Sequence, residues 1–454
     1  MRLLSFENKM ISTKQTLKNN EKKSSYRTKV ASHEPRNIAC LVTYQVVARI
    51  GWIFKTETVI MPAVLDACIA SGMLRGFLPV LNRIGTSLFP LVVAPFVSRT
   101  KSIRLFLVAT TIGLSLCFAV LSVAWSRLLN DHPFFLAIVF LCTYGLFSAV
   151  NGCNQLLVAT LQGRLISAGR RGRVLVLSVM SGSVIAIMAA FLALGPWLQE
   201  PNGFVKIFAA TSFFFAAAAV VPLFFKEPEN TFTAESRKAS DAVRSHSFWQ
   251  CLAHDRSLAR LAVVAACFSA AMILFPHYQA FAREQFGDTS HSLLTWIVVQ
   301  NIATGLASLV VGPLADHRGN RLVIIGLLGC CTGTPLFVAG LTMVSQSAAM
   351  QWFWLAYMPL GFNPIMLRII SNYALELAPT TGLQPRYVSL VGGAMALPFV
   401  LSPLVGWGID VLGGVPFFLV GSVIIASGTL VACGLPEPRN SHFSMQKSRE
   451  MKEN

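Results

Sequence analysis

Three arginines lie deep inside long apolar stretches of this 454-residue chain, where charged side chains are rare. They are Arg49, Arg83 and Arg368. An arginine at the centre of a bilayer costs about 2.5–3.5 kcal/mol on insertion scales, so three of them indicate a function. Guanidinium groups donate charge-assisted hydrogen bonds to carboxylates and phosphates. Their placement therefore predicts contact with an anionic or strongly polar small molecule.

Other polar side chains in these stretches recur at helical spacing. Tyr144, Ser148, Asn151 and Gln155 follow one another at steps of 4, 3 and 4, which places them on one face of a helix. Arg368 and Asn372 end a second stretch with the same steps, counted from Gly361. The predicted substrate-binding residues are Arg49, Arg83, Asn151, Gln155, His277, Gln300, Asn301, Arg368 and Asn372.

Glu57 is the clearest acid well inside an apolar stretch, and we predict it as the proton-coupling site. His277 has an intrinsic pKa suited to the same task, although a histidine beside Pro276 is more often a structural residue. Structural alternatives exist for the cations as well. Arg49 would pair with Glu57 along its own helix, Arg83 would bond carbonyls freed by Pro79, and Lys55 and Arg75 would extend toward the membrane surface.

Composition indicates that these residues lie on membrane-spanning helices. With 54% hydrophobic and 13% charged residues, the chain is unlike a soluble domain. A helix needs about 20 mostly apolar residues to cross a bilayer, and twelve runs are long enough. The predicted spans are 37–65, 76–97, 104–126, 134–160, 174–197, 203–225, 259–281, 291–314, 322–345, 349–373, 387–411 and 415–435.

The net charge of +17 has a topological explanation. Of the 37 Lys and Arg, 29 lie in or within two residues of the loops on the same side as the N-terminus. Such a bias marks the cytoplasmic side of a membrane protein, so both termini are expected to be cytoplasmic. This placement argues against nucleic-acid binding. We expect a multi-pass protein of the plasma (inner) membrane, whose partners are the lipid bilayer and a small molecule.

The predicted organisation has five parts. They are a disordered basic tail (1–36), a six-helix bundle (37–225), a cytoplasmic central loop (226–258), a second six-helix bundle (259–435) and a cytoplasmic tail (436–454). The ten cysteines have no spacing typical of a metal site, and no catalytic cluster or cofactor motif is present. Neither an enzyme nor a bound cofactor is expected.

The chain repeats itself. "APFVSRTKSIRL" (94–105) follows the second span as "GPLADHRGNRL" (312–322) follows the eighth, at an offset of 218 residues. Asn151 and Gln155 correspond to Arg368 and Asn372 at an offset of 217, and "FFKEPEN" (224–230) resembles "GLPEPRN" (434–440) at 210. The fold class is therefore an all-α membrane protein, with twelve transmembrane helices in two pseudosymmetric bundles. Parallel repeats of this kind are typical of transporters.

The second copy of this loop resembles the signature of the major facilitator superfamily, Gly-x-Leu-Ala-Asp-Arg-x-Gly-Arg-Lys. The positions that match are Gly312, Leu314, Ala315, Asp316 and Gly319, and Arg321 keeps the charge of the final lysine. His317 and Asn320 replace the two arginines, and Arg318 occupies the free position. In the first-half copy, Ser98 replaces the aspartate. The resemblance covers residues 37–435 and implies a central cavity between the bundles.

This loop predicts a gate formed by Gly312, Asp316, Arg318, Gly319 and Arg321. Gly312 would allow two helices to approach closely at the cytoplasmic end. Asp316 would meet the positive N-terminus of the eleventh helix, and the arginines would bond across the same seam. The alternative is a simple basic turn.

Together these features predict a secondary active transporter that works by alternating access. Its solute would be small, polar and anionic, its transport would be coupled to protons or another gradient, and we expect a monomer. The alternative is a non-transporting membrane assembly or lipid-handling factor that retains the fold. A non-transporter has no need of arginines at the membrane midplane, and this favours transport.

Overall fold

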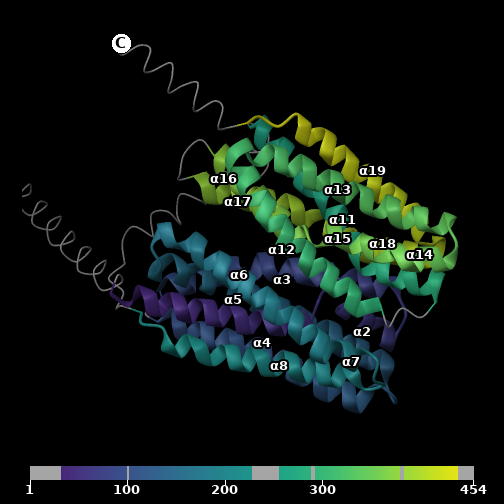
Figure 1. Cartoon of the computed structure of the whole chain (residues 1–454), viewed down its shortest axis with the longest axis horizontal. Coiled ribbons are helices and arrows are strands. Elements are labelled where there is room, and N and C mark those ends of the chain that lie inside the picture. The colour runs from purple at the N-terminus through teal and green to yellow at the C-terminus, as the bar shows by residue number, and fades with distance from the viewer. Residues whose placement is uncertain (1–31, 100–101, 228–254, 288–291, 379–382, 438–454) are drawn as a thin grey trace, which may run out of the picture.

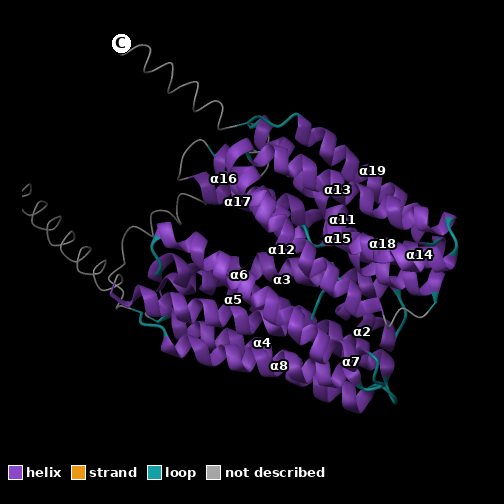
Figure 2. Ribbon diagram, in the orientation of Figure 1, coloured by secondary structure: helices purple, strands orange, loops and turns teal. Residues whose placement is uncertain are grey.

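The computed structural model describes residues 32–99, 102–227, 255–287, 292–378 and 383–437 (Figure 1). All regular secondary structure in these ranges is helical (Figure 2). Eleven of the described helices are long and apolar enough to cross a bilayer. The remaining predicted span, 76–97, lies within α3 (Gly72–Arg99), whose 28 residues reach about 42 Å at about 1.5 Å each. The all-helical membrane fold is confirmed, with α3 as the twelfth long helix.

The N-terminal bundle is built around α3, α4 and α5. Its helices are Ser32–Phe54, α2 (Ile60–Cys68), α3, α4 (Ile103–Leu128), α5 (Pro133–Leu165), α6 (Ala168–Ala189), α7 (Gly195–Leu198) and α8 (Gly203–Val220). Helix α5 packs against both α3 and α4, and α4 packs against α8. Aromatic rings fill the centre, where the ring centroids of Phe118 and Phe147 lie 5.0 Å apart.

The C-terminal bundle is centred on α11, which contacts α16, α17 and α19. Its helices are α11 (Arg256–Phe286), α12 (Leu293–Arg318), α13 (Asn320–Gly340), α14 (Gln346–Trp352), α15 (Tyr357–Leu360), α16 (Asn363–Leu377), α17 (Gln384–Ala396), α18 (Ser402–Leu412) and α19 (Gly414–Cys433). Figure 1 shows the two bundles side by side, with the purple-to-teal half below the green-to-yellow half.

Several predicted spans are interrupted helices. The first span was expected to be continuous over 37–65, but its helix ends at Phe54 and α2 begins at Ile60. The Thr56 hydroxyl bonds the carbonyl of Ile53 at 2.9 Å, a local bond that competes with helical hydrogen bonding. Elsewhere, a π-helical turn (Ala190–Leu194) precedes Gly195-Pro196, and a 3-10 segment (Leu397–Leu401) contains Pro398. Proline removes a backbone donor, which accounts for such irregular turns.

The two bundles end in the same way. In the first bundle, Glu227 accepts hydrogen bonds from the backbone N–H groups of Ile103 and Arg104, at 3.2 and 3.3 Å, at the start of α4. In the second bundle the corresponding acid, Glu437, lies against Gly319 at the start of α13. Carboxylates at helix N-termini are stabilising because the exposed N–H groups carry partial positive charge. The "KEPEN"/"PEPRN" repeat thus has a structural role.

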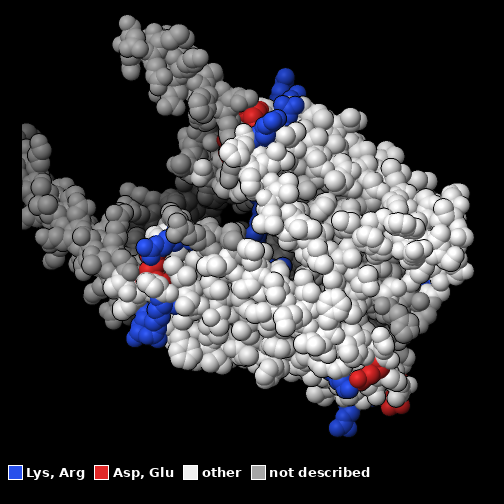
Figure 3. All heavy atoms as spheres, viewed as in Figure 1, with Lys and Arg blue, Asp and Glu red and all other residues white. Residues whose placement is uncertain are grey.

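The bundles meet at one end of the molecule and separate at the other. We call the end that holds Ser32 and Cys433 the tail end, and the opposite end, where α3 begins at Gly72, the far end. Contacts between the bundles run through α3, which packs against α11, α17 and α18, and through α6 with α12. Figure 3 shows a hollow between the bundles that opens toward the tail end, with Lys or Arg atoms inside it.

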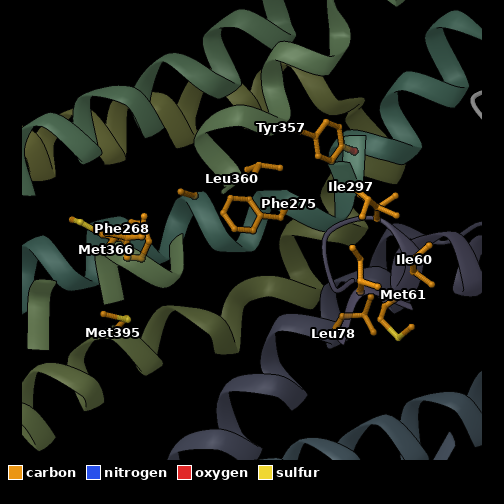
Figure 4. Close-up of a cluster of buried hydrophobic side chains, with 14 of the residues drawn as sticks. Ile60, Met61, Leu78, Phe268, Phe275, Ile297, Tyr357, Leu360, Met366 and Met395 are labelled. Carbon is orange, nitrogen blue, oxygen red and sulfur yellow. The ribbon is translucent and has the colours of Figure 1, made fainter. Parts of the chain in front are cut away.

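Apolar side chains fill the far end between the bundles. Met61 of α2 and Leu78 of α3 belong to the same buried cluster as Phe275 of α11 and Ile297 of α12 (Figure 4). Burial of large apolar side chains contributes about 1.5–3 kcal/mol each, so this cluster favours the closed far end.

Candidate functional site

Arg49 and Arg368 approach each other from opposite bundles. They lie close enough for their guanidinium charges to repel each other. Arg49 runs past α6, where a Cβ added to Gly182 would lie 2.9 Å from its Cδ. Arg368 is exposed on α16. Among the described residues, no carboxylate forms an ion pair with either side chain.

Arg83 contacts the opposite bundle. Its Nη2 atom donates to the carbonyl of Gly392 at 3.4 Å and to Sδ of Met395 at 3.1 Å, both on α17. Its Nε atom, like that of Arg49, is buried without a hydrogen-bond partner in the described part of the chain. Arg83 thus bonds a carbonyl of α17 and not one freed by Pro79. A carbonyl and a thioether do not neutralise its charge, and no described acid forms an ion pair with it.

Glu57 is paired with Lys55 rather than with Arg49. The two form an ion pair where the first span is broken, so the suggested Arg49–Glu57 pair is wrong. Helical geometry fails between Phe54 and Ile60, and Glu57 therefore does not lie two turns above Arg49 on one face. The Glu57 side chain is 38% exposed, against 1% for Lys55.

Lys55 occupies an aromatic cage. Its Nζ lies 4.5 Å from the ring centre of Trp52, 5.2 Å from that of Tyr144 and 4.4 Å from that of Phe147. Cation–π contacts of this kind stabilise an ammonium group where water is excluded. The expectation that Lys55 extends toward the membrane surface is therefore wrong.

The polar stripe of α5 is divided between two environments. Asn151 is buried and Gln155 is exposed. Tyr144 is also buried, and its hydroxyl accepts a hydrogen bond from Asn82 of α3 at 3.3 Å. Asn154, which we did not predict, binds Tyr44 and Thr111 within the bundle at 3.0 and 2.9 Å. The stripe both packs the bundle and presents one amide on its surface.

The predicted residues of the second bundle lie in different places. Gln300 accepts a hydrogen bond from Thr58 of the first bundle. Asn301 donates to the carbonyl of Ile297 within its own helix, at 2.8 Å. Asn372 is exposed one turn from Arg368 on α16. His277 is buried on α11.

The predicted gate residues lie at the end of α12 and the start of α13. A Cβ added to Gly312 would meet nothing within 4 Å, so the expected close approach of helices there is not seen. Arg321 donates to the carbonyl of Cys433 inside its own bundle, not across a seam between bundles. Arg318 is exposed, and Gly319 has a φ of +86°, which favours glycine. The side chain of Asp316 lies outside the described residues.

Charged residues join the bundles at the far end. Asp410 of α18 accepts the backbone N–H of Gly72 at 2.7 Å and lies 3.5 Å from Arg75 of α3. Arg75 also pairs with Asp66 of α2, and Arg283 of α11 lies 3.3 Å from the same carboxylate. We call these four side chains the far-end charge cluster. Arg75 is therefore buried in an ion pair and does not extend toward the membrane surface.

Glycines bring the backbones of α3 and α18 together beside this cluster. A Cβ on Gly72 would lie 2.3 Å from the carbonyl oxygen of Gly406, and one on Gly76 would lie 2.4 Å from that of Ser402. Small residues four apart permit such contacts between membrane helices. We did not predict the far-end seam from the sequence. Its signal was available, because Asp410 is a single acid at the end of an apolar run.

The fold and the site define a class of protein: a multi-pass helical membrane protein with two bundles around a charged central hollow. The family model of the Major Facilitator Superfamily matches residues 53–380. The chain belongs to this superfamily of membrane transporters.

Solved structures share the fold at low sequence identity. A crystal structure of the nucleoside transporter NupG aligns with a TM-score of 0.64 and 9% identity, over 88% of this chain and 98% of that one. A POT family transporter in complex with 5-aminolevulinic acid aligns with a TM-score of 0.65 and 14% identity, over 89% and 96%. No curated protein matches the chain. The family is therefore established, and the solute must be inferred from the site.

Proposed function

We propose that the protein transports a small anionic solute, a carboxylate or a phosphate ester, by alternating access. One observation carries the proposal: Arg49 and Arg368 approach from opposite bundles and repel each other, with no carboxylate paired to either among the described residues. An anion between them would neutralise the repulsion and offer acceptors to both guanidiniums. Binding would then favour closure of the hollow.

Charge balance distinguishes an anion from a neutral solute. Glu57 is the nearest acid along the chain to Arg49, and Lys55 already neutralises it. Arg83 adds a third positive charge whose contacts are a carbonyl and a thioether. Arg49 and Arg83 are half-buried. Charges partly withdrawn from water without counter-ions are costly, so an anionic ligand would relieve a cost that a neutral ligand leaves in place.

We further propose that the tail end is cytoplasmic and that the structure is an inward-facing state. The distribution of Lys and Arg supports this orientation, because 29 of the 37 lie in or within two residues of the loops on the side of the N-terminus. The closed far end then faces the exterior. The expectations of a monomer in the plasma membrane remain predictions.

The test is substrate binding and uptake by the purified protein in proteoliposomes. A panel of organic anions, phosphate esters, sugars, amino acids and organic cations identifies the solute class. With the best anion, Arg49→Gln or Arg368→Gln is expected to raise the dissociation constant about tenfold or more, equivalent to about 1.4 kcal/mol. Arg127→Gln removes an exposed arginine near the end of α4 and serves as the matched control.

Two results would contradict the proposal. One is uptake restricted to neutral or cationic compounds. The other is an anion whose affinity is the same in the Arg49→Gln, Arg368→Gln and Arg127→Gln proteins.

A further inference from the structure

His277 lies at the far-end seam. It is 1% exposed on α11, and a Cβ added to Gly406 would lie 3.0 Å from its Cε1. Neither ring nitrogen finds a partner among the described residues. The next residue, Tyr278, packs against Phe418, with ring centroids 5.2 Å apart. Buried polar groups are normally satisfied, so an imidazole with two unsatisfied nitrogens calls for an explanation.

This imidazole lies beside the far-end charge cluster. The members of that cluster are Asp66 of α2, Arg75 of α3, Arg283 of α11 itself and Asp410 of α18. Of these, Arg75 interacts with His277 most directly, as a repulsive positive charge. The cluster contains two carboxylates and two guanidiniums and is balanced when His277 is neutral. A protonated ring would add a third positive charge, and no described residue offers an acceptor to either N–H.

We infer that His277 is a proton-binding site that controls the far-end seam: the seam closes on the neutral ring and opens on the protonated one. The inference rests on the proposed alternating access and adds a site separate from Glu57. In the closed state, His277 packs against the backbone where α18 meets α3, so separating these helices would expose the ring to water. Water then solvates the imidazolium that the closed seam excludes.

The direction and the limit of the effect follow from linkage. If the open seam binds one proton more than the closed seam, lowering the pH favours opening. A single proton shifts the equilibrium by at most about tenfold per pH unit. The effect begins below about pH 7 and grows as the pH falls, because an imidazole in water takes up its proton at about pH 6.5 while the buried ring resists protonation. With the far end outside, an acidic exterior would favour the outward-open state.

Hydrogen–deuterium exchange of the full-length protein in nanodiscs measures this equilibrium directly. The N–H of Gly72 donates to Asp410 across the seam, so amides 71–76 exchange faster when the bundles part. Rates are corrected for the intrinsic effect of pH, and amides of α4 and α8 are the internal reference. We expect corrected exchange at 71–76 to rise about tenfold between about pH 7 and about pH 5, with the reference unchanged.

His277→Gln is expected to remove this pH dependence, and His277→Met is expected to do the same with an apolar side chain of similar length. His132→Gln is the matched control, because His132 is an exposed histidine before α5. Asp410→Asn breaks the Arg75 pair and is expected to raise exchange at every pH, which shows that these amides report on the seam.

The inference is overturned if wild-type exchange at 71–76 is independent of pH. It is equally overturned if the pH dependence persists in both His277 variants, since Asp66 or Asp410 would then be the titrating group. Exchange is measured without a solute. If anion binding does not depend on Arg49, the proposed function is refuted, and the pH dependence of exchange at 71–76 is unaffected.

Discussion

Gly406→Ala should prevent the far end from closing properly. In the structure a Cβ at this position would lie 2.0 Å from the carbonyl oxygen of Gly72 and 2.5 Å from its carbonyl carbon. Contacts between carbon and oxygen atoms below about 3.0 Å are strongly repulsive, so α3 and α18 must separate by roughly 1 Å to accept the methyl group. Backbone atoms cannot rotate away as a flexible side chain would.

The expected magnitude follows from this overlap. Overpacking of a well-packed contact costs typically about 1–3 kcal/mol. The cost applies to the closed seam and not to the open one, so the equilibrium shifts toward opening by about 5- to 150-fold. Replacing glycine by alanine also stabilises a helix by up to about 1 kcal/mol, an effect common to both conformations.

Exchange of amides 71–76 measures the shift, and Gly329→Ala in α13 is the matched control. A Cβ on Gly329 meets nothing within 4 Å, so this variant carries the helix-propensity effect alone. We expect Gly406→Ala to accelerate exchange at 71–76 while α4 and α8 keep wild-type rates, and Gly329→Ala to leave the seam unchanged. Equal seam exchange in both variants would refute the steric argument. Faster exchange throughout Gly406→Ala would show that the bundle is destabilised instead.

Three further predictions concern coupling, the predicted gate and orientation. Glu57→Gln removes the predicted proton site and should abolish solute accumulation driven by a pH gradient while solute exchange continues. Glu200→Gln, a change at an exposed acid, should alter neither accumulation nor exchange. Accumulation that persists in Glu57→Gln would exclude Glu57 as the proton site. Asp316→Asn or Arg321→Ala should slow transport without weakening solute binding, because the motif lies at the tail end. Loss of solute binding with an unchanged conformational equilibrium would contradict the predicted gate. A reporter fused after Asn230 should be cytoplasmic, and an exterior reading would reverse the proposed orientation.

The sequence was sufficient for the features that repeat or that follow from composition. Apolar runs located the helices to within a few residues, since span 134–160 corresponds to α5 (Pro133–Leu165). The repeat paired "KEPEN" with "PEPRN", and the structure places Glu227 and Glu437 at equivalent helix starts. Both results depend on local pattern and on the pseudosymmetry of the bundles.

Features that depend on how the bundles meet could not be read from the pattern. Asp66 lies at the end of the first predicted span, and no pattern in the sequence pairs it with Arg75 and with an arginine of the other bundle. Lys55 was expected at the surface because nothing in the sequence predicts that the chain leaves its helix at Phe54 and directs the amine onto three rings. The register of α3 against α18 places Asp410 at the start of α3, and a one-dimensional pattern does not contain that register.

The contact of α3 with α18 also bears on how such a protein evolves. At Gly72, Gly76 and Gly406 one backbone faces another with no room for a side chain, so substitution there is heavily restricted. The arginines that we assign to the solute are Arg49 on the first helix, Arg83 further along α3 and Arg368 on α16. None of them takes part in the backbone contact of α3 with α18. New solute preferences can therefore arise by mutation in the hollow while the contact of α3 with α18 is inherited unchanged.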